Sequence, residues 1–89
     1  MIEVAKHGRT ECLQVLIDKG ADVNVKDGCD KTALMVVARY GYTEGLKMLI
    51  EQGADVNVSD KYGNTALTDA AQLGRTECLK ILIDAGAKE

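Results

Sequence analysis

The sequence has no tryptophan, phenylalanine or proline, and only one histidine in 89 residues. Its 11 lysines and arginines form no stripe or cluster, and 14 acidic residues bring the formal charge to −3. The electrostatic footprint of a nucleic-acid-binding protein is therefore missing. No stretch without a charged residue is longer than the seven residues 32–38, far fewer than a membrane-spanning helix needs.

Cysteine is also scarce. Three residues, Cys12, Cys29 and Cys78, make an odd set that fits a reducing compartment better than a disulfide framework. The opening MIEVAKHGRT has no basic segment followed by an apolar one, so we expect no secretory leader. We therefore predict an intracellular protein, cytoplasmic or nuclear, without membrane contact.

The chain does contain a regular repeat. Gly8, Gly41 and Gly74 lie 33 residues apart, and the sequence GRTECL occurs both at 8–13 and at 74–79. A fixed period of this size is typical of a stacked repeat array, in which each unit buries one face against the next. Such an array presents a surface rather than a catalytic cavity, so it favours a binding function.

Within the middle copy the pattern predicts two short helices. Thr32 can cap a first helix over the apolar run 33–38, and Gly41 is placed to end it. We expect Thr43 to cap a second helix, whose apolar residues over 46–50 follow the i, i+3, i+4 spacing of one face. By the same pattern, threonines at equivalent places cap the second helices of the other copies.

Several segments resemble the ankyrin repeat. They are DKYGNTAL at 60–67, AAQLG at 70–74, LKILI at 79–83, and the loop opening GADVN at 20–24 and 53–57. The resemblance covers essentially the whole chain. The nearest rival, a 34-residue two-helix repeat, would require tryptophan and other large aromatic residues that this chain lacks.

The resemblance implies an all-α solenoid of antiparallel helix pairs with protruding β-turn or hairpin fingers. We expect about two and two-thirds repeats in one array: a truncated first repeat at 1–26, a second at 27–59 and a third at 60–89. This gives six short helices and two fingers. Helices of this length are marginal in isolation, so stacking must stabilise them.

Some residues depart from the family pattern. Its Thr-Pro-Leu-His motif becomes TALM at 32–35 and TALT at 65–68, so helix-start rigidity and hydrogen bonding should be reduced. Asp30 stands where the other finger has Gly63, which would place an aspartate at positive φ. Gly45 lies inside a predicted helix and should weaken it.

The two ends of the predicted array are poorly capped. Thr68 and Asp69 replace Met35 and Val36 of the middle copy, which we interpret as a partly polar outer face on the third repeat. Weak capping leaves two alternatives to a self-contained binding module. The chain could be a structural segment of a longer array, or a unit that associates with itself through its ends.

No residue pattern predicts catalysis or metal binding. His7 has no partner set, and Cys12 falls on an apolar helix. Every repeated glycine is explained by a turn or a helix end, so we expect no enzyme, cofactor or metal site. Cys12 and Cys78 occupy one slot two repeats apart, roughly 20 Å at ~10 Å per helix layer, and both should be buried. Cys29 should lie near a finger tip.

The resemblance implies a protein-binding surface made of the finger tips and the concave side of the first helices. Tyrosine and arginine, which are enriched in binding hot spots, occur in the predicted set. Its members are Lys6 and His7 in the first copy, Gly28, Cys29, Lys31, Arg39 and Tyr40 in the second, and Lys61, Tyr62, Asn64, Gln72 and Leu73 in the third. Alternatively, Tyr40 and Tyr62 are surface residues of the scaffold and make no contact with a partner.

Three further residues have scaffold roles. Tyr42 should contribute to packing, and Asn24 and Asn57 should brace their loops by hydrogen bonds to the backbone. The resemblance also makes these two asparagines possible sites of hydroxylation. We conclude that the chain is a non-catalytic module that binds a protein partner of unknown identity, as a monomer or with weak self-association through its terminal repeats.

Overall fold

The computed structural model describes residues 5–6 and 10–87. Five helices are assigned there: α2 (Thr10–Asp18), α3 (Ala33–Tyr40), α4 (Thr43–Glu51), α5 (Ala66–Gln72) and α6 (Thr76–Asp84). None of the described residues forms a strand. The sixth predicted helix, at the start of the first copy, falls mostly outside the described residues.

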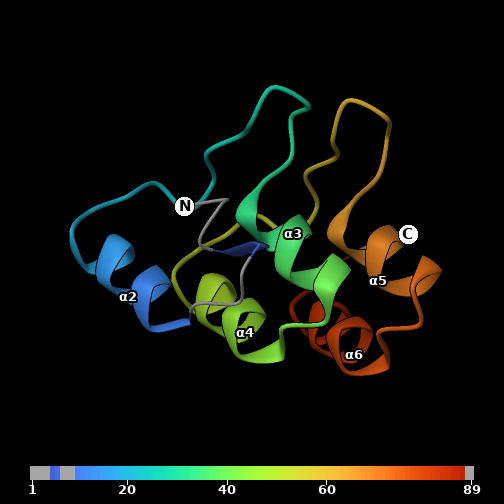
Figure 1. Ribbon diagram of the computed structural model, residues 1–89. Coiled ribbons are helices and arrows are strands. Elements are labelled where there is room, and N and C mark those ends of the chain that lie inside the picture. Colours follow the sequence, from blue (N-terminus) through green and yellow to red (C-terminus); the bar gives the residue numbers. More distant parts are fainter. Residues whose placement is uncertain (1–4, 7–9, 88–89) are drawn as a thin grey trace.

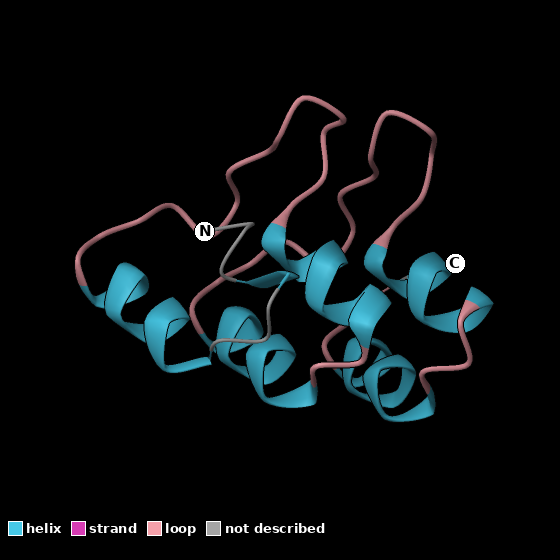
Figure 2. Ribbon diagram, in the orientation of Figure 1, coloured by secondary structure: helices cyan, strands magenta, loops and turns pink. Residues whose placement is uncertain are grey.

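The helices form two layers (Figures 1 and 2). Helices α3 and α5 lie side by side in one layer, and α2, α4 and α6 follow one another in the second. Each first helix packs on the second helix of its own repeat, α3 on α4 and α5 on α6. Two long loops project from the same side of the array. The predicted all-α solenoid with protruding fingers is confirmed.

Glycine lets each helix pair fold back on itself. Gly41 adopts φ 74°, and the next amide, of Tyr42, donates a 2.9 Å hydrogen bond to the Val37 carbonyl. Gly74 adopts φ 67°, and the Arg75 amide likewise donates to Ala70 at 2.8 Å. These bonds satisfy carbonyls that a helix end would otherwise leave free.

The core is concentrated in the middle copy. All six residues of 33–38 are buried, and so are Leu46 and Leu49 of α4. Helix α3 contacts both α4 and α5, so neighbouring helices cover more than one of its faces. A residue in a repeat array is thus buried largely by the adjacent repeat.

The first helices of the second and third copies are capped as predicted. The Met35 amide donates to the Thr32 hydroxyl at 3.4 Å, and the Thr68 amide donates to the Thr65 hydroxyl at 3.2 Å. Thr68 also accepts from the Thr65 amide at 3.3 Å, which completes a reciprocal capping box. Thr68 thus restores hydrogen bonding that we expected to be lost at this helix start.

The prediction that threonines cap the second helices is wrong for α4 and α6. The N-cap of α4 is Tyr42 and that of α6 is Arg75, and neither makes a side-chain capping bond. Only one residue follows each turn glycine before the helix begins. Thr43 and Thr76 therefore already have helical geometry, whereas an N-cap residue must lie outside it.

One slot in the helix interface is filled differently in two copies. Gly45 is buried, and a Cβ atom built on it would lie 3.2 Å from Val37 Cγ1, closer than ordinary contact. The third copy has Cys78 in the place of Gly45 and Ala70 in the place of Val37. A small residue on one helix is matched by a larger one on its neighbour, so the pair conserves volume.

The cysteine predictions are partly corrected. Cys78 is 1% exposed, as expected, but Cys12 is exposed although it occupies the same slot. Helix α6, which carries Cys78, packs against both α4 and α5, whereas the neighbour of α2 is α4 of the following copy. Cys29, expected at a finger tip, is half-buried.

Asp30 has φ 63°, matching φ 81° at Gly63, as the sequence predicts. Left-handed geometry costs a residue with a Cβ atom about 1–2 kcal/mol relative to glycine. We expect Asp30→Gly to raise the free energy of unfolding by about 0.5–1 kcal/mol, since glycine's greater freedom when unfolded offsets part of the gain. Urea unfolding measures it, and Gly63→Asp, the reciprocal control, should destabilise. A lower stability of Asp30→Gly would contradict the strain argument.

Candidate protein-binding surface

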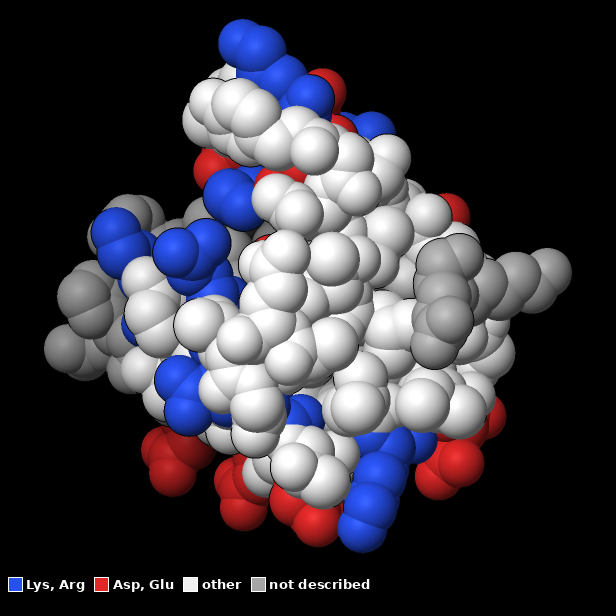
Figure 3. Space-filling view, turned by 90° about the vertical axis from the view of Figure 1, so that its right-hand side faces the viewer, with Lys and Arg blue, Asp and Glu red and all other residues white. Residues whose placement is uncertain are grey.

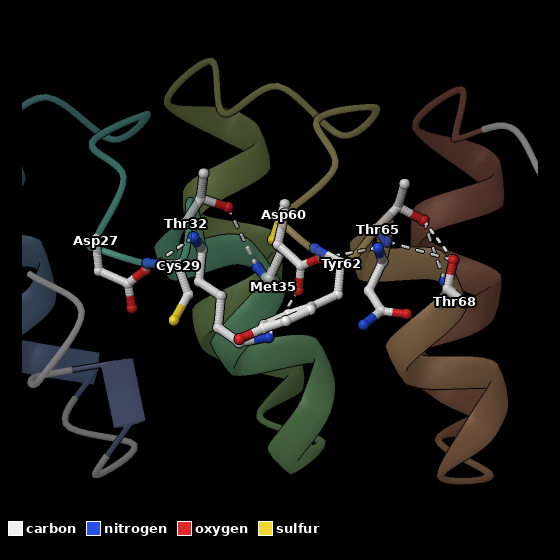
Figure 4. Close-up of polar contacts among 10 residues, drawn as sticks. Asp27, Cys29, Thr32, Met35, Asp60, Tyr62, Thr65 and Thr68 are labelled. Carbon is white, nitrogen blue, oxygen red and sulfur yellow. Dashed lines mark hydrogen bonds and ion pairs between the residues drawn. The ribbon is translucent and has the colours of Figure 1, made fainter.

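One aspartate organises each finger. Finger 1 is residues 27–31 and finger 2 is residues 60–64. In finger 1, Asp27 Oδ1 accepts from the Cys29 and Lys31 amides, both at 2.9 Å. In finger 2, Asp60 Oδ1 accepts from the amides of the equivalent residues, at 2.8 and 2.9 Å (Figure 4). The two turns are therefore held by the same side-chain-to-backbone bonds.

The two fingers are also joined to each other. The Lys61 amide donates to the Cys29 carbonyl at 2.9 Å. The Lys31 ammonium donates to Asp60 Oδ2, also at 2.9 Å, and Asp60 is only 6% exposed. A charge-assisted hydrogen bond is shorter and stronger than a neutral one, and breaking it would leave the buried carboxylate uncompensated. The fingers thus form one linked unit, and Lys31 is engaged in holding it.

These contacts shift the pKa values of both partners. Burial alone would raise the pKa of Asp60, but bonds from Lys31 and from the Asn64 and Tyr62 amides lower it to about 2. The hydrogen bond to Asp60 raises the pKa of Lys31. The ordinary Asp60 pKa is 3.8, so this carboxylate stabilises the fold above about pH 4, and the contribution fades between about pH 4 and pH 2.

We expect Lys31→Met to destabilise the protein at neutral pH, because it leaves the buried Asp60 carboxylate without its cation. A loss of about 2 kcal/mol is expected, and the Asp60 pKa should rise. The free energy of unfolding measured between pH 2 and pH 7 checks both effects. Asp60→Asn is the matched control: it should remove most of the wild-type loss of stability below pH 4. Equal pH profiles for wild type and Asp60→Asn would contradict this assignment.

The predicted contact residues are largely accessible. Tyr62 is 69% exposed, Leu73 47% and Tyr40 39%. The other exposed members are Lys6, Gly28, Arg39, Lys61 and Gln72, while Cys29, Lys31 and Asn64 are partly buried. His7 lies outside the described residues. Arg39 and Tyr40 end α3, the helix that begins directly after finger 1.

The tyrosines of the set differ in their surroundings. Tyr40 stacks on Tyr42 with ring centroids 5.7 Å apart, and the Tyr42 hydroxyl donates to the Lys6 carbonyl at 3.4 Å. Tyr42 is therefore a packing residue, as the sequence indicates, and its ring contacts the Tyr40 ring by stacking. Tyr62 lies in finger 2, where its amide donates to Asp60 (Figure 4). We name the exposed side of the fingers together with Arg39 and Tyr40 the finger face.

Asp69 is a feature that the sequence interpretation missed. We expected it on a polar outer face, but it is 4% exposed and its Oδ2 has no hydrogen-bond partner. Burial raises the pKa of Asp69, although Lys31 and Arg39 oppose the shift. The position is equivalent to Val36, which is 7% exposed, so both copies bury it. The equivalence of Asp69 with Val36, an apolar residue inside a predicted helix, is the sequence signal that could have predicted this burial.

We expect Asp69→Val to raise the free energy of unfolding at neutral pH by about 1–2 kcal/mol, because a buried carboxyl with one unpartnered oxygen is removed. The raised pKa of Asp69 means that its charge destabilises the fold above that pKa, so the gain should shrink as the pH falls. Thermal unfolding at pH 7 and pH 4 provides the measurement. Asp69→Asn is the control, because it removes the charge and keeps a polar group; a destabilised Asp69→Val would refute the argument.

The GADVN asparagines link successive repeats. Asn24 Oδ1 accepts from the Asp55 amide at 2.8 Å, and its Nδ2 donates to the Gly53 carbonyl at 3.4 Å. Asn57 Nδ2 donates in the same way to the Gly86 carbonyl at 3.3 Å. These side-chain bonds brace the loop of the following copy, whereas the sequence predicts bonds within the asparagine's own loop. Their hydroxylation stays a prediction.

The described residues offer little for metal or membrane chemistry. They contain no group of three or more His, Cys, Asp or Glu side chains that could hold a metal ion. Nor do they contain a helix with the length and apolar character needed to cross a membrane. The cysteines of this part of the chain are free thiols, and burial raises the pKa of the Cys78 thiol.

Comparison with known proteins identifies the class. A profile of ankyrin repeats, in three copies, matches residues 1–89. The chain therefore belongs to the ankyrin repeat family. Among solved structures it is similar to the crystal structure of the human ASB11 ankyrin repeat domain, with 33% identity and a TM-score of 0.93. The match covers 98% of this chain and 39% of that one.

A comparison with curated protein sequences gave no significant match. In contrast, 432 chains of solved structures match, so the fold is too widespread to select one partner. Ankyrin repeats generally act as protein-interaction modules and are typically non-catalytic.

Proposed function

We propose that this chain binds a protein partner through the finger face, without catalysis of its own. The observation that carries the proposal is the joined pair of fingers. The Lys31–Asp60 ion pair and the Lys61–Cys29 backbone bond fix the fingers relative to each other. A surface that is already ordered loses less conformational entropy when it binds, which favours affinity.

The chemistry of the finger face favours a partner segment that combines apolar or aromatic contact area with polar groups of both charges. Tyr62 and Tyr40 offer aromatic area with a polar hydroxyl, and Arg39 and Lys61 offer exposed cations. On the same side, Asp60 is neutralised by Lys31 and Asp69 is buried. Finger 1 also exposes Asp27 and Asp30, so the finger face presents charges of both signs beside its tyrosines.

The intracellular location remains part of the proposal. Proteins of this family are often intracellular, and three free thiols are compatible with a reducing compartment. The alternative function, a structural segment of a longer array, is supported by one observation: an apolar groove lies at the C-terminal end of the array.

The test is recovery of a binding partner with the wild-type chain as bait, followed by affinity measurements on variants. We expect Tyr62→Ala to weaken binding by roughly 30-fold, about 2 kcal/mol, as for a hot-spot residue. Arg39→Ala should weaken binding less and reduce its salt dependence. Tyr62 is mostly exposed, so its replacement should leave the fold intact.

Lys47→Ala is the matched control, since Lys47 is exposed on α4 in the opposite layer. It should bind as the wild type does. If Lys47→Ala lost binding while Tyr62→Ala and Arg39→Ala kept it, the partner would sit on the second helices and the finger face would be the wrong assignment.

A further inference from the structure

The C-terminal end of the array carries an apolar groove. Its volume is about 590 Å³, and it is lined by Leu67, Thr68, Ala71, Leu79, Ile83 and Ala87. Ile83 is 56% exposed. Figure 3 looks onto this end: uncharged residues form its centre, and lysine, arginine and acidic side chains lie at its margins. We name it the end groove.

The end groove repeats a surface that is already covered elsewhere in the chain. Its six residues lie 33 positions after Leu34, Met35, Ala38, Leu46, Ile50 and Ala54, and five of the six pairs are identical in residue type. In the middle copy these positions are buried or partly buried in the core. The elements that follow there are α5, packed on α3, and α6, packed on α4. The groove is thus shaped for another helix pair of the same kind.

A matching helix is exposed at the other end of the chain. Helix α2 reads TECLQVLID and α6 reads TECLKILID, so they differ only at Gln14/Lys80 and Val15/Ile81. In α6, Cys78 is buried and Ile81 is partly buried against the core. In α2 the equivalent residues are exposed, with Val15 at 54%. The chain therefore exposes a close copy of a helix that it buries elsewhere.

The direction of the contact follows from Gly45, which occupies the slot of Cys12 and Cys78. A Cβ atom at Gly45 would lie 3.9 Å from Leu13 Cδ2 in the preceding copy. The slot thus faces a leucine one repeat earlier. Carried forward by the same period, Cys12 of a second chain would face Leu79 in the end groove.

We propose that the end groove binds helix α2 of a second copy of this chain, head to tail, in the register by which α6 packs on α4. The charges permit it. Helix α6 has Glu77, Lys80 and Asp84 where α4 has Glu44, Lys47 and Glu51, and α2 has neutral Gln14 where α6 has Lys80. The new contact introduces no charge that the internal contact lacks. It uses the end faces and not the finger face, so it stands independently of the proposed partner binding.

A head-to-tail contact joins two different surfaces, and this makes it separable from a symmetric dimer. Val15→Glu should block α2 and Ile83→Glu should block the groove. Every head-to-tail contact requires one intact α2 and one intact end groove, so each variant alone should remain monomeric. A mixture of the two retains one intact pair of surfaces, the groove of Val15→Glu and the α2 of Ile83→Glu, and it should form dimers that cannot extend.

Light scattering under reducing conditions over a wide concentration range provides the mass. For the wild type we expect a mass that rises with concentration above the 9.6 kDa of one chain. Each variant should stay at the monomer mass, and their equimolar mixture should approach twice that mass and stop. Lys47→Glu, which introduces an acid at an exposed position of α4 in the middle copy, should associate as the wild type does.

Three results would overturn the proposal: a constant wild-type mass, association of Val15→Glu as strong as in the wild type, or a mixture that stays monomeric. The second would indicate contact between two end grooves. Both substituted positions are more than half exposed, so the fold should persist, and thermal unfolding of each variant verifies this. A variant that loses association together with its cooperative unfolding is replaced by Val15→Lys or Ile83→Lys, for which the same outcomes apply.

Discussion

The structure depends on burial between neighbouring repeats, because no single repeat has enough apolar contact of its own. Its helices are seven to nine residues long. Isolated helices of that length are marginal in water, so each must gain its stability from the helices beside it. Every residue of α3 from Ala33 to Ala38 is buried because other elements surround it, whereas in α5 the equivalents of Met35 and Ala38 are less covered: Thr68 is partly buried and Ala71 is exposed.

Polar contacts add a second set of links in the same register. The Lys31–Asp60 pair joins the fingers on one side, and the asparagine bonds of Asn24 and Asn57 join successive loops. Each such bond spans 29 or 31 residues of sequence, which is close to one repeat. The apolar stack brings the repeats together, and these directional bonds restrict how one repeat can rotate or slide on the next.

The sequence predicts most of the local geometry. Gly41, Gly74 and Gly63 adopt the expected positive φ, Asp30 matches them, and Thr32 and Thr65 cap their helices. These features depend on a few neighbouring residues. The failures depend on more distant ones: Cys12 and Cys78 share a sequence pattern, yet only Cys78 lies against a preceding repeat. Asp69 was misjudged because a polar residue alone does not reveal how its surroundings bury it. The links of Lys31 and Asn24 to the next repeat also exceed what local patterns show.

The exchange of volume between Gly45 with Val37 and Cys78 with Ala70 has an evolutionary consequence. Both members of each pair belong to the same repeat, while the facing leucine, Leu13 in the case of Gly45, is the same in every copy. Recombination at the boundary between repeats therefore keeps each matched pair together. A crossover between the two helices of a repeat would instead set Cys beside Val, which is overfilled, or Gly beside Ala, which leaves a void. Duplication and loss of whole 33-residue units is thus the path by which such an array can change length without losing its packing.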